Sequence, residues 1–187
     1  MLSLESDRLK MRNYKESNLP EYHRMMSDKV NMYYLADLIT NSIEESYDSL
    51  KKTIEANAGE NCRRYCITLK DVDKLIGAVG YEIPCKTSLG NTADPMGWFL
   101  MPEYQNQGYM TEAVKRLLKF AFLQDNCLRV VTACFKQNIP TQKVMSKAGF
   151  KIQAEKTSVM WLDGQMRDRL EFVINKDEFM QIHGVVS

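Results

Sequence analysis

The sequence lacks the features that identify several large classes of protein. Its apolar runs are only a few residues long, whereas a membrane-spanning helix requires roughly 20. Its first residues include Glu5, Asp7 and Arg8 instead of the apolar core of a signal peptide. The 25 basic and 24 acidic residues give a net charge of +1, so no long-range field favours nucleic acid or an anionic membrane surface. We therefore expect a cytoplasmic protein that binds neither nucleic acid nor membranes.

The cysteines are too few and too irregularly spaced for crosslinks or a zinc ribbon. A disulfide framework needs paired cysteines, and a zinc ribbon needs Cys-x-x-Cys pairs. The five cysteines are odd in number and form no such pair: Cys62, Cys66, Cys85, Cys127 and Cys134. We expect them to pack as small apolar side chains, and we expect no bound metal.

The length and the apolar pattern favour one domain in which strands and helices alternate. With 187 residues, 44% of them hydrophobic, the chain can form one well-buried domain and is short for two, so residues 1–187 are expected to be a single domain. Periodicity predicts strands at residues 8–13, 64–69, 75–83, 96–101, 128–134, 150–161 and 166–174. Helices are predicted at 19–26, from Ser42 to near Gly59, after Gly108 and after Asn138. Residues 84–95 are predicted to be a loop.

Two local signals mark where elements begin and turn. Ser42-x-x-Glu45 is a capping-box pattern, which predicts a helix start at Ser42. Asp163-Gly164 is a tight-turn dipeptide, which predicts a hairpin between the last two strands. Behind Ser42, one helix face is predicted to be apolar: Ile43, Tyr47, Leu50 and Ile54.

A glycine precedes an amphipathic helix in the segment from Tyr104 to Ala113. The strand-like run Gly97–Leu100 comes before it, and apolar residues follow at helical spacing. The amides of a first helical turn lack intrahelical acceptors and carry partial positive charge, so they can hold an anion without a lysine. Gly108 lets the anion approach the main chain. The segment therefore predicts a phosphate-binding helix start, and an ordinary structural N-terminus is the other interpretation.

Three segments resemble the GCN5-related N-acetyltransferases (GNAT), in particular their RimJ/RimL-like branch. Gln105-x-x-Gly108-x-Met110 resembles the family's pyrophosphate loop, Gln/Arg-x-x-Gly-x-Gly/Ala, except that Met110 replaces a small residue. The segment from Asn138 to Phe150 resembles the branch's Asn-x-x-Ser-x-x-Val-Leu-x-Lys-Leu-Gly-Phe helix. Residues 4–12 resemble its opening strand, and the resemblance extends in family order to about residue 179.

The resemblance implies an α/β fold of known kind and acetyl-CoA as co-substrate. It implies a mixed, mostly antiparallel sheet of about seven strands with helices on both faces. The fourth and fifth strands, near 96–101 and 128–134, would splay apart, and pantetheine would pair with the fourth like an added strand. Asn138 would bind pantetheine, or would only cap its helix. The expected cofactor-binding residues are Phe99, Leu100, Met101, Gln105, Asn106, Gln107, Gly108, Tyr109, Met110, Thr111, Asn138 and Thr141.

Acetyl transfer to an amine needs a neutral amine, a donor for the oxyanion and an acid for the departing thiolate. Many family members use a tyrosine as the acid, but the matching position here is Met145. The resemblance points instead to the hydroxyl of Thr141, which is otherwise a capping or packing residue. For the base, three alternatives stay open: Asp94, Glu82, or water in a desolvating pocket. Glu112 is excluded, because the helix dipole explains an acidic residue in a first turn.

The leading hypothesis is an N-acetyltransferase that moves an acetyl group from acetyl-CoA to a primary amine by direct transfer in a ternary complex. The acceptor would be a protein N-terminus or a small-molecule amine. The alternative is a CoA-binding regulatory module with little or no activity, suggested by Met110, Met145 and the proline at the usual carboxylate position. Met25, Met26 and their aromatic neighbours predict either an apolar acceptor pocket or an ordinary core. The sequence leaves a homodimer open.

Overall fold

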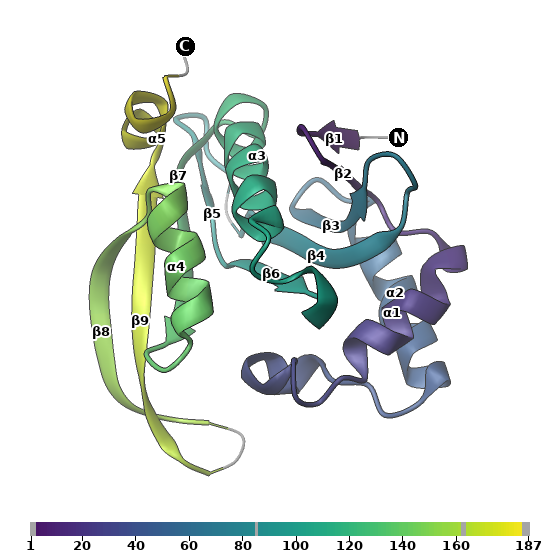
Figure 1. Ribbon diagram of the computed structural model, residues 1–187. Coiled ribbons are helices and arrows are strands. Elements are labelled where there is room, and N and C mark those ends of the chain that lie inside the picture. The colour runs from purple at the N-terminus through teal and green to yellow at the C-terminus, as the bar shows by residue number, and fades with distance from the viewer. Residues whose placement is uncertain (1–2, 85, 162–163, 185–187) are drawn as a thin grey trace. The chain divides into compact units, whose positions relative to one another are not determined.

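The computed structural model describes residues 3–84, 86–161 and 164–184, which divide into two compact units (Figure 1). The first unit extends to Gly80 and resumes from Trp98 to Ala113. The second comprises Tyr81–Gly97 and the residues from Val114 onward. The divisions fall within β4 (Leu75–Glu82), β6 (Met96–Leu100) and α3 (Tyr109–Leu123), so each of these elements contributes to both units.

The first unit is built on a five-stranded sheet with the order β1-β2-β3-β4-β6. β1 (Ser3–Glu5) pairs antiparallel with β2 (Leu9–Arg12), and β2 pairs antiparallel with β3 (Cys62–Leu69). Helices α1 (Leu19–Met26) and α2 (Ile43–Ala56) lie side by side in this unit (Figure 1). The unit also contains short 3-10 helices: η1 (Glu16–Asn18), η2 (Tyr33–Leu38) and η3 (Pro102–Tyr104).

The core of the first unit joins the two helices to the sheet. Met25 and Met26 of α1 and Leu50 of α2 belong to one buried cluster with residues of β3, β4 and β6. Tyr14 and Tyr22 meet edge to face in this cluster, with ring centres 5.4 Å apart. For the buried methionines, the interpretation as an ordinary core is therefore correct.

Ser42 begins α2, as the capping pattern predicts. Its side chain accepts a hydrogen bond from the Glu45 amide at 3.2 Å. The Glu45 carboxylate accepts from the amide of Asn41 at 2.7 Å, one residue before the cap. Both contacts satisfy amides at the helix start, which would otherwise lack an acceptor.

The predicted apolar face of α2 is only partly buried. Leu50 is fully buried and Ile54 packs against the core, whereas Ile43 and Tyr47 are 42% and 39% exposed. The residues that α2 buries are Ser46, Leu50 and Thr53. Ser46 can be buried because its hydroxyl lies 2.6 Å from that of Thr40 and 2.8 Å from Nδ1 of His23. These partners come from other segments, so apolar periodicity could not place a serine in the core.

The second unit is built on a four-stranded sheet with the order β5-β7-β9-β8. β5 (Asn91–Ala93) pairs parallel with β7 (Cys127–Phe135), and β9 (Met166–Asn175) pairs antiparallel with both β7 and β8 (Lys151–Met160). β8 and β9 form a long hairpin (Figure 1). The unit also holds α4 (Ile139–Ala148) and α5 (Lys176–His183), and Phe122 of α3 meets Phe179 of α5 at 5.2 Å between ring centres.

The predicted fold class is confirmed, with differences in detail. The architecture is mixed α/β: β1 with β2, β2 with β3, β7 with β9 and β8 with β9 pair antiparallel, and β5 with β7 pairs parallel. The segment predicted to be a loop contains β5, and β1 was not predicted, so the described residues form nine strands instead of about seven. The helix α5 was not predicted either. β6 and β7, where the splay is predicted, belong to different sheets.

Two sequence predictions fall partly outside the described residues. Of the predicted Asp163-Gly164 turn, Asp163 lies outside them, and Gly164 has a φ of 75°. Cys85 also lies outside them. Among the described cysteines, those that are buried are Cys66, Cys127 and Cys134, and none of the described cysteines is in a disulfide.

A buried arginine joins β2 to the turn after β3. The Arg12 guanidinium donates to Asp73 at 2.8 Å, to the Asn18 side chain at 3.0 Å and to the Asn13 carbonyl at 3.0 Å. The hydrogen bond from Arg12 lowers the pKa of the Asp73 carboxyl. Because this pKa is lowered in the folded state, the pair's contribution to stability is present above the ordinary carboxyl pKa and is lost as the pH falls through the lowered value.

We expect Asp73→Asn to destabilise the first unit, because it leaves the buried guanidinium without its counter-charge. Breaking a fully buried pair costs more, but Asp73 is 46% exposed, so we expect a loss of about 2 kcal/mol in the free energy of unfolding at neutral pH. The deficit should shrink as the pH falls through the lowered pKa of Asp73, because the wild-type carboxyl then becomes protonated as well. Urea denaturation at neutral pH and at a series of acidic pH values measures it. Asp71→Asn in the same exposed turn is the control, and equal midpoints for both variants would contradict the prediction.

Candidate active site

The Gln105–Gly108 loop turns the chain into α3 through two residues with positive φ angles. Asn106 has a φ of 59° and Gly108 a φ of 82°. Turns that include left-handed residues can bring successive amides to one side and form an anion-binding concavity. The first intrahelical bond of α3 runs from the Glu112 amide to the Gly108 carbonyl, at 3.1 Å. The amides of Tyr109–Thr111 precede it and therefore have no acceptor within the helix.

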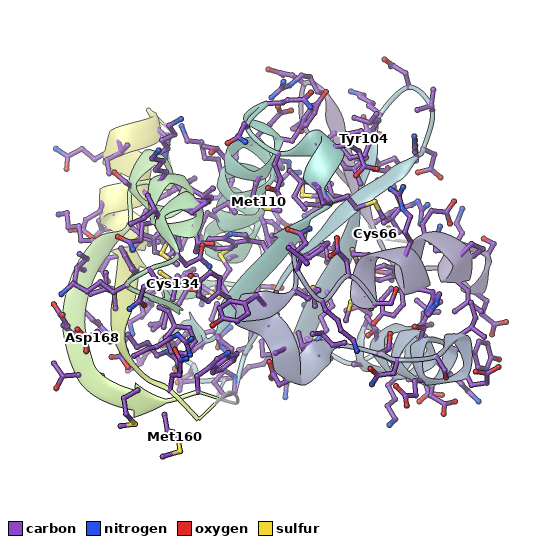
Figure 2. The ribbon with its side chains drawn as sticks, turned by 60° about the horizontal axis from the view of Figure 1, so that its bottom comes forward. Cys66, Tyr104, Met110, Cys134, Met160 and Asp168 are labelled. Atoms are coloured by element: carbon purple, nitrogen blue, oxygen red, sulfur yellow. The ribbon has the colours of Figure 1, made fainter. Side chains whose placement is uncertain are left out.

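The side chain of Met110 does not occupy the exposed side of this loop. Met110 lies in the first turn of α3 (Figure 2). It is only 6% exposed, whereas Gln107 and Gly108 are exposed. The larger residue at this family position is therefore accommodated by burial. The Met110 amide is still one of the first-turn amides that have no acceptor within the helix.

Arg8, just before β2, contacts the loop and the first turn of α3. Its amide and its Nε donate to the two carboxylate oxygens of Glu112, at 2.9 and 2.7 Å, and its Nη1 donates to the Gln107 carbonyl at 3.0 Å. Its guanidinium carbon lies 4.3 Å from the centre of the Tyr109 ring, a cation–π contact. The Ser6 hydroxyl also donates to Glu112, at 2.8 Å. The start of α3 is thus tied to the β1–β2 segment.

The same contacts explain why Glu112 is a structural residue. Burial by itself would raise its pKa, but the hydrogen bonds from the Arg8 amide, the Ser6 hydroxyl and the Arg8 side chain outweigh burial and hold the pKa below the usual value. An ionised carboxylate with these partners is a poor proton acceptor. This agrees with its exclusion as a base.

β6 is the last strand of its sheet, and its polar groups alternate between two sides. The Met101 amide donates to the carbonyl of Ile76 on β4 at 2.9 Å. A Cβ on Gly77 of β4 would come within 2.4 Å of the Phe99 carbonyl, so only glycine permits this close approach. Both contacts turn polar groups of Phe99 and Met101 toward β4. The main-chain groups of Leu100 therefore point to the opposite side.

The Leu100 carbonyl accepts hydrogen bonds from two side-chain amides. Asn31 Nδ2 and Gln105 Nε2 each donate to it at 3.0 Å, and Gln105 Nε2 also donates to Asn31 Oδ1 at 2.8 Å. Gln105, predicted to reach a pyrophosphate or to end the strand, therefore lies back along β6 here. A carbonyl oxygen has two lone pairs, so a ligand that pairs with Leu100 must displace one of these amides.

Asn138 and Thr141 meet at the start of α4. The Asn138 side-chain oxygen accepts from the Thr141 amide at 3.3 Å, which is an N-cap contact. This contact uses the oxygen and leaves the Nδ2 group as a donor. In the part of the chain that the structure describes, the Thr141 hydroxyl makes no hydrogen bond. Met145, at the position of the family's tyrosine, is fully buried.

The two candidate bases are neighbours in the second unit. The amide of Asp94, which precedes β6, donates at 2.9 Å to the carbonyl of Glu82 at the end of β4. Asp94 is exposed and lines a small open groove of about 160 Å³, together with Arg129 of β7 and Glu171 of β9. Glu171 is paired with Lys156 at 2.6 Å. Asp94 thus places a carboxylate at a surface groove.

The predicted site residues form one set in each unit. The first unit brings together Phe99–Met101 and Gln105–Thr111. The second unit holds Glu82, Asp94, Asn138 and Thr141, with contacts between Glu82 and Asp94 and between Asn138 and Thr141.

Sequence reasoning missed Arg8 and Asn31 as neighbours of the loop. Arg8 lies 104 residues from Glu112 and Asn31 lies 74 residues from Gln105, so no local pattern links them. For Arg8 the available signal was its place in the opening strand that resembles the family. Asn31 carried no such signal.

The family model of the acetyltransferase (GNAT) domain matches residues 8–151. The match covers more than half of the chain and includes the Gln105–Gly108 loop and the start of α4. The chain therefore belongs to the GNAT acetyltransferase family, and the predicted family is confirmed.

Individual relatives share the fold at low identity. The chain is 27% identical over 150 residues to YnaD of Bacillus subtilis strain 168, an uncharacterized N-acetyltransferase, covering 80% of this chain and 83% of YnaD. RimL, a ribosomal L7/L12 α-N-protein acetyltransferase solved with coenzyme A, matches at a TM-score of 0.81, with 18% identity and coverage of 95% and 99%. Spermidine N-acetyltransferase from Vibrio cholerae, solved with CoA and spermine, matches at 0.79, with 20% identity and coverage of 94% and 99%. These two likenesses show the fold.

The described residues contain neither a metal-binding cluster nor a membrane-spanning helix. No group of three or more histidine, cysteine, aspartate and glutamate side chains among residues 3–84, 86–161 and 164–184 is placed to hold a metal ion. In the same part of the chain, no helix has both the length and the apolar character needed to cross a membrane.

Asn138→Asp separates the capping role of Asn138 from its predicted cofactor role. The substitution keeps an oxygen for the Thr141 amide and removes the Nδ2 donor. We expect acetyl-CoA to bind about tenfold more weakly, as for one lost hydrogen bond of about 1.4 kcal/mol, with an unchanged melting temperature. Calorimetric titration and thermal unfolding measure the two effects. Asn138→Ala, which loses the cap as well, should also lose about 1 kcal/mol of stability. If Asn138→Asp bound acetyl-CoA with wild-type affinity, Asn138 would serve only as a helix cap.

Proposed function

We propose that this protein transfers an acetyl group from acetyl-CoA to a primary amine, directly, within a ternary complex. The observation that carries the proposal is the start of α3, where the turn at Asn106 and Gly108 precedes three amides that have no acceptor within the helix, in a chain of the GNAT family. Such a helix start suits a pyrophosphate. The family match extends across both units, which supports a single acetyltransferase domain over residues 1–187.

In this proposal, acetyl-CoA is held mainly by the main chain. The amides of Tyr109–Thr111 and the exposed side of Gln107 and Gly108 receive the pyrophosphate. The pantetheine arm pairs with Leu100, whose polar groups face away from β4, and replaces the Gln105 or Asn31 amide there. Neutral hydrogen-bonding groups of this kind orient the thioester without a metal.

The reaction joins the amine nitrogen to the thioester carbon and breaks the carbon–sulfur bond. The amine must first be neutral, since an ammonium has no lone pair. Of the two candidate carboxylates, Asp94 is the proposed proton acceptor, and its side chain is exposed at a surface groove. A backbone amide of β6 stabilises the oxyanion, and the Thr141 hydroxyl hydrogen-bonds the departing thiolate. The products are an amide and the free thiol of CoA.

The acceptor is a protein N-terminus or a small-molecule amine. RimL and spermidine N-acetyltransferase, which share the fold, carry those two substrate classes in their names. A panel of peptides with free N-termini and of polyamines, read by release of the CoA thiol, tests both. A second candidate function, a CoA-binding regulatory module, is favoured by the buried thioether of Met145 at the usual acid position. Acetyl-CoA binding without turnover of any amine would support it.

Gly108→Asp should abolish acetyl-CoA binding with little loss of fold. A carboxylate beside the pyrophosphate adds like-charge repulsion, which we expect to raise the dissociation constant at least about a hundredfold in calorimetric titration. Gly184→Asp is the matched control, since Gly184 is another exposed glycine with positive φ, at the end of α5. If Gly108→Asp bound acetyl-CoA like the control, the pyrophosphate would not lie at this helix start.

Thr141→Val should slow the transfer step. Valine keeps the shape and removes the hydroxyl, so we expect kcat to fall roughly 10- to 100-fold with nearly unchanged acetyl-CoA affinity. Thr141→Ser, which retains the hydroxyl, should keep most of the activity. A wild-type rate in Thr141→Val together with a collapse in Asp94→Asn would mean that proton removal from the amine, and not thiolate departure, depends on the protein's side chains.

A further inference from the structure

We propose that Arg8 is a positioning residue that keeps the Gln105–Gly108 loop in the shape that receives the pyrophosphate. This inference rests on the proposed function, because it concerns the same site. Arg8 lies outside the loop and outside α3, yet it contacts the loop carbonyl of Gln107, the ring of Tyr109 and the carboxylate of Glu112. Through these three contacts, the Arg8 side chain holds the loop and the first turn of α3 together.

The contact with Gln107 determines where the next amide points. A peptide bond is planar and trans, so the carbonyl of Gln107 and the amide of Gly108 point in opposite directions. Arg8 Nη1 holds that carbonyl at 3.0 Å, which turns the Gly108 amide away from the guanidinium. Arg8 Nη2 also lies near Gly108, 3.4 Å from where a Cβ would be. Without this anchor, the peptide can rotate and lose the amide direction that an anion needs.

The contact with Glu112 removes net charge from this arrangement. The Arg8 guanidinium and the Glu112 carboxylate are 2.7 Å apart, so the guanidinium's positive charge is largely balanced. The Arg8 side chain is 47% exposed, and exposed ion pairs contribute little to global stability. Arg8 therefore acts through the geometry of the loop, more than through long-range attraction or through the stability of the fold.

The test compares two acetyl donors that differ in the pyrophosphate. Acetyl-CoA carries the pyrophosphate and the nucleotide, whereas S-acetylpantetheine carries only the arm and the thioester. For Arg8→Gln we expect the dissociation constant of acetyl-CoA, measured by calorimetry, to rise about tenfold. The constant for S-acetylpantetheine, measured by displacement, should stay within about twofold, and kcat at saturating acetyl-CoA should also stay within about twofold.

Two further variants test whether the effect of Arg8 comes from the shape of its guanidinium group, from its positive charge or from the loss of an exposed ion pair. Arg8→Lys keeps the charge, but one ammonium cannot reproduce the fork that contacts Gln107 and Glu112 at once, so acetyl-CoA affinity should still fall several-fold. Lys70→Gln is the matched control: it removes another exposed ion pair of the same region, with Glu5 at 3.1 Å, and should leave both affinities unchanged.

The outcomes distinguish this inference from the proposed function. No binding of acetyl-CoA by the wild type would defeat the proposed function itself. Wild-type binding with equal affinity in Arg8→Gln would overturn the inference alone. If Arg8→Gln lost affinity for both acetyl donors equally and had a lowered melting temperature, Arg8 would have a structural role, and the inference would also be overturned. If Arg8→Gln does not fold, the donor comparison is made with Arg8→Lys and Glu112→Gln, and the same criteria apply.

Discussion

The site depends on one constraint, which is that the first amides of a helix have no acceptor within it. In α3 these amides belong to Tyr109–Thr111, and in the part of the chain that the structure describes no carbonyl of the preceding loop accepts from them. The helix itself is anchored by a buried apolar face that includes Met110 and Leu117. The burial fixes the helix, and the unpaired amides at its start become a rigid set of donors. Without side-chain cations, such donors still favour an anion.

Side chains remote in sequence complete what the backbone begins. Arg8 and Ser6 hold Glu112, and this holds the first turn of α3 in place. On β6, side-chain amides of Asn31 and Gln105 cover the outward carbonyl of Leu100. Both groups are polar, partly exposed and hydrogen-bonded, so ligand binding exchanges existing contacts for new ones and does not simply fill unpaired positions. Hydrogen bonds with other side chains also allow Ser46 and Arg12 to lie buried in the first unit.

Local signals predicted the element starts well, because caps and turns depend on neighbouring residues. Ser42 and Asn138 cap helices as their side chains suggest, and Gly108 and Gly149 adopt positive φ at helix boundaries. The predicted apolar face of α2 is only partly buried, since hydrogen bonds with Thr40 and His23 allow Ser46 to lie in the core beside Leu50. β5 was missed, because three residues without alternation become a strand only by pairing with β7.

The sequence by itself determined the alternating elements, the glycine at the start of α3 and membership of the GNAT family, because each of these depends on residues close together in the chain. Tertiary structure alone decided that Gln105 lies back on Leu100, that Arg8 contacts Gln107 and Glu112, and that Asp94 lines a groove with β7 and β9. The physical reason is that hydrogen bonds and ion pairs depend on distance in space. Residues 74 or 104 positions apart become neighbours only after the strands have paired.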